Sequence, residues 1–220
     1  MSARIIDRLT PRPGECALDL GCGTGLYSRC LVDRAGYTFC ADPSRKMLDQ
    51  LSADASLFKV QATAEEITDG AVTLGREHFD AILAKEMLHH VPRPNRSEVL
   101  EGVARLLSPH GRLLIILMPP TIDHPLFVAA LRRYEHHPID PAEAAAVLAE
   151  IGLKTEVTVE TFRVAVEKQR WLTMIRDRYM SLLSKFDDQE LAAGVVEVDA
   201  GHPERVLEFD DRFIFILARR

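Results

Sequence analysis

Three alternating glycines give the clearest chemical signal in the sequence. An apolar segment that includes Asp19 runs directly into Gly21, Gly23 and Gly25. Such a loop turns tightly, lets a ligand approach the bare backbone, and opens a helix whose first N–H groups have no helical partner. The dinucleotide fingerprint GxGxxG would need glycine at position 26, where this chain has leucine. The spacing therefore predicts a cofactor site on the loop and disfavours a pyrophosphate.

A second acid stands at the end of the next apolar segment. Asp42 follows the strand-like residues 37–41 and lies 21 positions beyond Gly21. In glycine-loop nucleotide folds, an acid about 20 residues on, at the tip of the second strand, binds the ribose hydroxyls. We therefore expect the ligand to carry a ribose. With Asp19 before the loop and Asp42 after it, a tight turn without a ligand becomes the weaker interpretation.

The elements that must position these residues follow from the hydrophobic pattern. Strand-like runs alternate with amphipathic stretches as far as Ile151, which predicts βαβ units and a parallel, doubly wound sheet. We expect strands at residues 16–20, 37–41, 57–61, 79–84 and 112–118, and helices at residues 27–34, 44–53, 95–107 and 141–150. Ser44 and Asn95 are predicted as helix caps, and Gly111 and Gly152 as stop signals.

The pattern changes after Gly152. Residues 154–166 and 212–218 are predicted as strands, with helices over 168–186 and 187–199 between them. This indicates one domain over residues 1–220 with a helical cap, residues 167–200, inserted between its last two strands. An apolar stripe recurs in the cap, formed by Trp171, Ile175, Tyr179 and Leu183 with Leu172, Leu182 and Phe186 beside them. We interpret the stripe chiefly as core packing, and secondarily as a wall of an acceptor pocket.

Composition narrows the class of protein. The chain has 220 residues, is 47% hydrophobic and carries a formal charge of -6, which fits a globular domain and argues against nucleic-acid or anionic-membrane partners. Its four cysteines match no zinc or CxxC spacing, so we expect small buried thiols in a reducing, cytoplasmic compartment, without a secretory leader. The apolar run 113–118 is far shorter than the roughly 20 residues of a bilayer span.

Four segments together resemble the class I S-adenosylmethionine-dependent methyltransferases, in their small-molecule branch. They are Asp19–Gly25, Asp42, the fourth-strand motif Phe79–Val91 and the turn Leu106–Leu113, and they lie within the half of the chain between Ala17 and Met118. The resemblance implies a Rossmann-like, doubly wound α/β sheet of seven strands, mostly parallel with an antiparallel last strand. It also implies S-adenosyl-L-methionine as cofactor and S-adenosyl-L-homocysteine as product.

The resemblance implies cofactor contacts residue by residue. Gly21, Gly23 and Gly25 would approach the methionine and ribose portions, Asp19 would lie near the amino group, and Asp42 would hold the ribose hydroxyls.

Further cofactor contacts are implied after the second, third and fourth strands. Pro43 would lie against the adenine, with Ala64 and Glu65 at its edge and Lys85 nearby. Relatives usually carry an acid where this chain has Thr63, whose hydroxyl does not replace a carboxylate. Only residues 1–15 precede the first strand, so we expect the cap, or a second subunit of a homodimer, to cover the cofactor unless the site stays open.

Methyl transfer is an in-line displacement that asks the protein mainly to align an acceptor, and a positioned base helps if the acceptor must lose a proton. His89 and His90 are the candidate catalytic bases, with His89 expected to point away from His90 and into the pocket. His90 could instead bond a loop backbone. Glu86 is a candidate substrate contact or a helix cap. Lys85 near a sulfonium suggests an acceptor with a carboxylate.

The second half of the chain supplies further candidates for substrate contact, namely Tyr134, Trp171, Arg176 and Tyr179. Arg176 and Arg178 could clamp a carboxylate or simply be a solvated helix face, which is the favoured interpretation. His124, His136 and His137 are not accompanied by an acidic cluster, so we expect no metal.

Three other functions compete with small-molecule methylation. Enzymes that methylate base amino groups carry Asp or Asn, two prolines and an aromatic residue after strand four, where this chain has Lys85-Glu86-Met87, so no nucleic-acid partner is expected. A nicotinamide-dependent reductase would need the dinucleotide fingerprint, which lacks its third glycine here because residue 26 is leucine. A protein that binds the cofactor without transferring methyl stays open as the main alternative.

Overall fold

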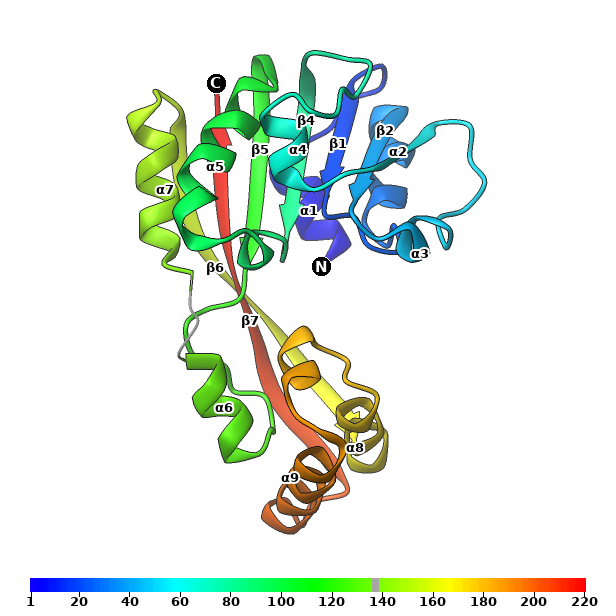
Figure 1. The fold of residues 1–220 in the computed structure, drawn as a ribbon, viewed down its shortest axis with the longest axis vertical. Helices are drawn as coiled ribbons and strands as arrows, with labels where there is room; N and C mark the ends of the chain where they lie inside the picture. The colour runs from blue at the N-terminus through cyan, green and yellow to red at the C-terminus, as the bar shows by residue number, and fades with distance from the viewer. Residues whose placement is uncertain (136–138) are drawn as a thin grey trace. The chain divides into compact units, whose positions relative to one another are not determined.

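The computed structural model describes residues 1–135 and 139–220, so His136 and His137 lie outside the described residues. The chain divides into two compact units (Figure 1). Unit 1 comprises Met1–Leu117, Ile139–Thr158 and Ile214–Arg220. Unit 2 comprises Met118–Pro138 and Val159–Phe213.

A seven-stranded sheet organises the fold, in the order β3-β2-β1-β4-β5-β7-β6. Its strands are β1 Cys16–Leu20, β2 Tyr37–Asp42, β3 Leu57–Gln61, β4 Phe79–Lys85, β5 Leu107–Leu117, β6 Lys154–Glu167 and β7 Val206–Arg219. Neighbouring strands from β3 to β5 pair in parallel, and β7 pairs with β5 in antiparallel register, Arg112 opposite Arg219 and Leu117 opposite Ile214. The predicted Rossmann-like sheet with its antiparallel last strand is confirmed.

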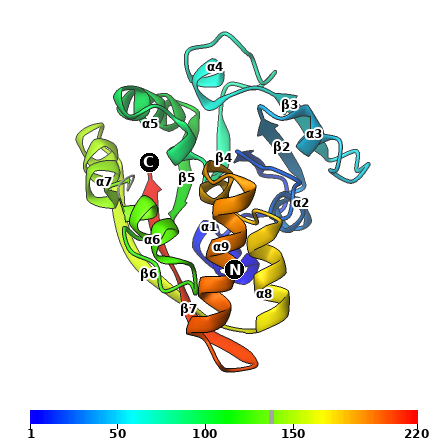
Figure 2. The same cartoon turned by 60° about the horizontal axis from the view of Figure 1, so that its bottom comes forward.

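Helices cover both faces of this sheet in unit 1. They are α1 Ser2–Leu9, α2 Ser28–Ala35, α3 Arg45–Leu48, α4 Ala64–Thr68, α5 Arg96–Arg105 and α7 Pro141–Glu150. Helices α4, α5 and α7 lie in a row on one face, with α1 and α2 on the other (Figures 1 and 2). Alternate strand residues such as Leu18, Ile82 and Leu113 are fully buried under the first group, which anchors the strand ends that carry the site.

Several predicted boundaries need correction. Ser44 caps α3 as predicted, through a hydrogen bond from the Met47 N–H, but the helix ends at Leu48. Asn95 makes no side-chain cap bond, because it sits in the 3₁₀ turn Arg93–Asn95 with helical backbone angles. Gly111 does not stop a helix but lies inside β5. A Cβ there would be 2.9 Å from the Ser108 carbonyl, so glycine permits close backbone packing.

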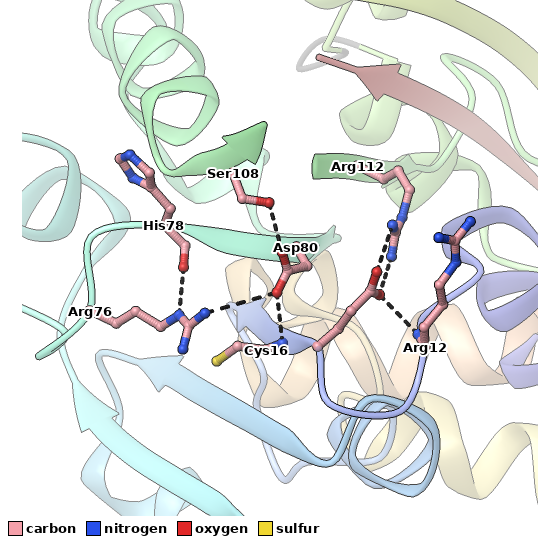
Figure 3. A network of polar contacts seen from close by, with 8 residues as sticks. Arg12, Cys16, Arg76, His78, Asp80, Ser108 and Arg112 are labelled. Carbon is pink, nitrogen blue, oxygen red and sulfur yellow. Dashed lines mark hydrogen bonds and ion pairs between the residues drawn. The ribbon is translucent and has the colours of Figure 1, made fainter. Parts of the chain in front are cut away.

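A polar network ties together the amino-terminal ends of three central strands (Figure 3). The Asp80 carboxylate on β4 accepts the Cys16 N–H of β1 at 2.9 Å and the Ser108 hydroxyl of β5 at 2.7 Å. Although burial opposes it, these two bonds lower the pKa of Asp80. Glu15 also pairs with Arg112 on β5. The network therefore stabilises the strands at the edge opposite their carboxyl ends.

Unit 2 contains α6 Val128–Glu135, α8 Lys168–Arg176, the 3₁₀ helix η3 Ser181–Lys185, α9 Asp188–Gly201 and the adjoining parts of β6 and β7. The predicted helix over 168–186 is interrupted, because Arg178 adopts a left-handed φ of 54° after α8. The apolar stripe packs into the core of this unit as predicted, with Trp171 and Ile175 buried. None of the helices in the described ranges is long and apolar enough to cross a bilayer.

Candidate functional site

The glycine loop follows β1 and takes a backbone course that side chains would obstruct. Gly21, Gly23 and Gly25 all have positive φ, at 76°, 54° and 78°. A Cβ on Gly21 would lie 2.5 Å from Met87 Cβ, and one on Gly25 would lie 2.8 Å from Leu51 Cγ. A Cβ on Gly23 would meet no atom within 4 Å. Gly21 and Gly25 thus let the loop pack against the protein, and Gly23 leaves open space for a ligand.

Several N–H groups of this loop donate to protein acceptors. Gly21 and Cys22 donate to the Ala41 carbonyl at 2.8 and 3.0 Å, and Gly25 donates to the Cys22 carbonyl at 3.0 Å. Helix α2 begins only at Ser28, so its N-terminus does not lie directly at the glycines. A pyrophosphate is bound best where a helix N-terminus points at it. This arrangement favours a ligand without phosphate, which agrees with an adenosyl sulfonium compound.

Asp42 lies at the carboxyl end of β2, beside the loop. One carboxylate oxygen accepts the Gly23 N–H at 2.9 Å and the other accepts the Ser44 N–H at 2.8 Å. These bonds hold the carboxylate plane in one orientation, and each oxygen keeps a lone pair for a further donor. The geometry suits two neighbouring hydroxyls, as the ribose contact requires.

Asp19 is buried within β1, with a relative exposure of 3%. Its carboxylate accepts a 2.5 Å hydrogen bond from the Ser28 hydroxyl at the start of α2, a partner that the sequence reasoning missed. Burial raises the pKa of Asp19 to about 6, against the opposing effects of the Ser28 bond and the Lys85 charge. A cationic ligand near this carboxylate would favour its charged form, which suits an ammonium or sulfonium group.

The third strand ends in a segment that departs from the family pattern. Thr63 accepts the Glu66 N–H at 3.1 Å while Glu66 accepts the Thr63 N–H at 2.8 Å, forming a capping box at the start of α4. Thr63 therefore acts as the N-cap residue of α4. Ala64 is buried and Glu65 half-buried in the first turn of α4, and Pro43 is exposed. Their predicted adenine contacts stay predictions.

Lys85 and Glu86 lie where β4 ends. The Lys85 ammonium sits 5.4 Å from the centre of the Tyr27 ring, a cation–π contact that the sequence did not indicate. Glu86 has a left-handed φ of 53°, and its N–H donates to the Ile116 carbonyl at 2.9 Å. This turn brings Met87 against Gly21. The predicted cofactor-side residues of β1, β2 and β4 are thus gathered at one edge of the sheet in unit 1.

The two candidate catalytic histidines are arranged differently from the prediction. Their ring centres lie 4.0 Å apart, so His89 does not point away from His90. The expectation assumed strand-like alternation, whereas both residues belong to the 3₁₀ turn η1, Leu88–His90. Desolvation by neighbouring atoms, followed by the His90, Arg96 and Lys85 charges, lowers the pKa of His89 to about 4, although its side chain remains exposed. His89 is therefore neutral at pH 7 but a weak base.

Four of the five predicted substrate residues belong to unit 2, and the fifth, Glu86, belongs to unit 1. The Tyr134 hydroxyl donates to the Pro119 carbonyl at 2.6 Å, and the buried Trp171 donates its indole N–H to the Pro125 carbonyl at 2.7 Å. Arg176 is exposed at the end of α8. Tyr179 contacts His124, and its ring centre lies 5.0 Å from that of Trp171. The structure thus brings Trp171 and Tyr179 together.

Two further findings concern the other charged candidates. Arg178 pairs with Asp188 at 2.7 Å and donates to the Phe186 carbonyl, so it is engaged within unit 2 rather than paired with Arg176 as a clamp. In the part of the chain that the structure describes, no three His, Cys, Asp or Glu side chains are grouped so as to hold a metal ion.

The chain resembles known proteins in both sequence and fold. Residues 18–115 match the family described as a methyltransferase domain. The chain is 30% identical over 164 residues to a ubiquinone biosynthesis O-methyltransferase of Xylella fastidiosa (strain 9a5c), a match covering 69% of this chain. It covers only 65% of that relative, just under two thirds of its length.

Solved structures share the fold over nearly the whole chain. The YcgJ protein from Bacillus subtilis aligns with a TM-score of 0.67 and 17% identity, covering 100% of this chain and 97% of that one. The [4+2]-cyclase SpnF aligns with a TM-score of 0.64 and 16% identity, covering 100% and 80%. At such identities these likenesses show the fold alone.

Proposed function

Since the chain belongs to the class I S-adenosylmethionine-dependent methyltransferases, we propose that it transfers a methyl group from S-adenosyl-L-methionine to a small-molecule acceptor. The observation that carries the proposal is the glycine loop of unit 1. A Cβ on Gly23 would meet no atom within 4 Å, and the Gly23 N–H holds the Asp42 carboxylate beside the loop. When bound, the cofactor supplies an activated methyl group on a sulfonium.

The chain's own residues then have defined tasks. Asp42 would accept hydrogen bonds from the ribose hydroxyls, and Asp19, held by Ser28, would place a negative charge near the amino group. Lys85 is directed over the Tyr27 ring and lies within electrostatic range of Asp19. Because Asp19 offsets the Lys85 charge, Lys85 no longer requires an acidic acceptor. The prediction of a carboxylate on the acceptor now rests on exposed Arg176 alone.

The relatives in ubiquinone biosynthesis support an acceptor that is methylated on oxygen. The match to the Xylella fastidiosa relative spans 164 residues, 69% of this chain. We therefore extend to this chain a small hydroxylated compound as the acceptor class.

Titration calorimetry with S-adenosyl-L-methionine tests cofactor binding. Replacing Asp42→Asn leaves one acceptor oxygen and removes one charge-assisted hydroxyl bond, worth about 1.5–3 kcal/mol, so we expect the affinity to fall by about 10- to 150-fold. Asp49→Asn is the matched control, because Asp49 is an exposed acid in the surface ion pair with Arg45. Undiminished affinity in Asp42→Asn, with both variants folded, would contradict the assigned ribose contact.

The second candidate is a protein that has the methyltransferase fold and binds the cofactor but transfers no methyl group. We keep this candidate because a [4+2]-cyclase shares the fold, and one fold can carry different functions. Release of S-adenosyl-L-homocysteine during incubation with a cell extract separates the two. Release above the blank supports the enzyme, whereas binding without release supports the alternative. A reductase would instead be stabilised more by nicotinamide nucleotides than by S-adenosyl-L-methionine.

A further inference from the structure

Unit 2 contains a cavity of about 280 Å³. Its walls come from three stretches of the chain, namely the segment that precedes α6, the helix α6 itself, and the residues that run from the end of α9 into β7. Every lining residue belongs to unit 2. The volume lies just below the roughly 300–1,000 Å³ that is typical of sites for drug-sized ligands, so the cavity suits a small organic molecule.

Much of the cavity wall is apolar. Six apolar side chains contribute to it, those of Ile122, Pro125, Leu126, Leu131, Leu207 and Phe209. His124 extends this surface, because its Nδ1 lies 3.1 Å from the Tyr179 hydroxyl and its Nε2 lies 3.0 Å from the Asp211 carboxylate. With both nitrogens engaged, the ring presents carbon atoms to the cavity. A ligand gains free energy by covering such a surface with an apolar body.

Three carboxylates also line the cavity, and nearby arginines offset only part of their charge. Asp123 pairs with Arg212 at 2.9 Å. Glu208 pairs with Arg163 at 2.8 Å, but the same guanidinium also pairs with Asp210 at 3.2 Å. One guanidinium therefore serves two carboxylates, and this side of the cavity keeps an excess of negative charge.

Glu204 is the third lining carboxylate, and its partner is a histidine rather than an arginine. Its oxygen lies 3.1 Å from His202 Nδ1. A hydrogen bond from its own backbone N–H, followed by the His202 bond, lowers the pKa of Glu204, so this carboxyl is ionised at neutral pH. Its second oxygen and the remaining lone pairs can accept further hydrogen bonds.

Two other basic residues of unit 2 have acidic partners that do not line the cavity. Lys168 pairs with Asp199 at 2.7 Å. Arg205, which follows Glu204 in the sequence, pairs with Glu167 at 3.4 Å. These pairs are each neutral as a whole, so they do not offset the negative charge of the lining carboxylates.

We propose that this cavity binds a small organic cation, an ammonium group carried on an apolar body. The body covers the apolar wall, and the ammonium donates hydrogen bonds to the carboxylates of Glu204 and Glu208. The same carboxylates repel an anionic ligand, and a bare metal ion leaves the apolar wall uncovered. The inference goes beyond the proposed methyl transfer, because the binding needs no S-adenosyl-L-methionine.

Titration calorimetry of the full chain tests the charge of the ligand with three probes that share a phenyl ring. They are 2-phenylethylamine, which is cationic, 2-phenylethanol, which is neutral, and 3-phenylpropanoate, which is anionic. We expect the amine to bind about tenfold or more tightly than the alcohol, and the carboxylate to bind most weakly. Added salt should weaken binding of the amine but not of the alcohol, because ions screen exposed charges.

Two calorimetric results would overturn the proposal. One is a chain that shows no binding of the amine, and the other is an amine that binds no more tightly than the alcohol. S-adenosyl-L-methionine is absent from these titrations. Their outcome is therefore separate from that of the cofactor titration, which tests the proposed function.

Glu204→Gln tests the contribution of one carboxylate. The substitution keeps the shape of the side chain and removes its charge, so we expect affinity for the amine to fall by about two- to fivefold and affinity for the alcohol to stay unchanged. Glu167→Gln is the matched control, because Glu167 is an exposed acid of unit 2 that does not line the cavity. Equal falls in both variants would contradict a local role of Glu204.

NMR of the backbone amides locates the bound amine. Addition of 2-phenylethylamine should shift the resonances of Leu207 and Phe209, which line the cavity, and leave those of Gly21 and Gly23 in place. Ile122→Trp should remove most of these shifts, because the larger side chain at this half-buried position fills the space. Shifts confined to the glycine loop, or shifts undiminished in a folded Ile122→Trp, would overturn the assigned cavity.

Discussion

The titratable side chains of the two units differ in what surrounds them. In unit 1, burial dominates, raising the pKa of Asp19 to about 6 and lowering that of His89 to about 4, so each is moved toward its neutral form. In unit 2, His124 bonds a carboxylate through one nitrogen and a tyrosine hydroxyl through the other. A charged ligand completes the first arrangement, whereas the second is already complete, because both nitrogens of His124 have partners.

This difference separates ligand binding from internal support. A buried carboxylate with a raised pKa gains from a cation, so the glycine-loop region suits the charged cofactor. A buried histidine with a bond partner on each ring nitrogen ties together the segments that carry those partners. We therefore assign cofactor binding to unit 1 and a stabilising role to the His124 hydrogen bonds of unit 2, and substitutions in either unit can break this division.

The largest effect is expected from His124→Ala. The substitution leaves the Tyr179 hydroxyl and the Asp211 carboxylate without their partner and opens a cavity beside the Trp171 ring, so we expect the unfolding free energy in urea to fall by about 2–4 kcal/mol. His202→Ala is the matched control, because His202 is a second histidine of unit 2 that bonds a surface carboxylate, Glu204, at 3.1 Å. Losses of equal size in both variants would contradict a stabilising role for the buried bonds of His124.

Asp19→Asn tests the unit 1 side through stability. The folded carboxyl has a pKa of about 6 against an ordinary value of 3.8, so the folded state binds its proton more tightly and loses stability as pH rises from about 4 to 6. The amide keeps an acceptor for Ser28 and cannot ionise. We expect the unfolding free energy at pH 7 to increase by about 2–3 kcal/mol, and cofactor affinity to fall.

Urea unfolding of the wild type and Asp19→Asn at pH 7 and pH 4 checks this expectation. The difference between them should nearly vanish at pH 4, where the folded wild-type carboxyl is protonated and the unfolded one has begun to take up its proton. The exposed Asp49→Asn should change stability by less than about 0.5 kcal/mol at either pH. A difference of equal size at both pH values would rule out ionisation of Asp19 as its cause.

The parts of the fold and of the candidate site that could be predicted are those whose sequence signal comes from residues close together in the chain. The glycine loop and Asp42 lie on adjoining strands, so their spacing alone indicated the cofactor edge, and the strand at 57–61 was predicted with its observed ends. The histidine pair was placed wrongly because β4 ends at Lys85 and the following residues turn, which apolar alternation does not reveal.

The hydrogen bonds of His124 to Tyr179 and Asp211 in unit 2 could not be predicted from the sequence for another reason. His124 is separated by 55 positions from Tyr179 and by 87 from Asp211. No periodicity links residues from a loop, a helix end and a strand. Tyr179 was a candidate through its place in the apolar stripe, but its partners follow only from tertiary packing. The left-handed turn at Arg178, which ends α8 early, also carried no sequence signal, since the residue is not glycine.

A smaller effect is expected from Trp171→Phe, which measures the hydrogen bond that Trp171 adds to the core of unit 2. The substitution leaves the Pro125 carbonyl without its 2.7 Å indole donor in a buried place. We expect the unfolding free energy in urea to drop by about 1–3 kcal/mol. An unchanged unfolding free energy would contradict a stabilising role for this bond.

The smallest effect is expected from His89→Ala. With a pKa of about 4, the imidazole holds its proton too weakly to draw one from a hydroxyl, and the ring is exposed, so we expect kcat to fall by no more than about threefold. A loss of 100-fold, with unchanged cofactor affinity, would show that His89 acts as the base in spite of its low pKa.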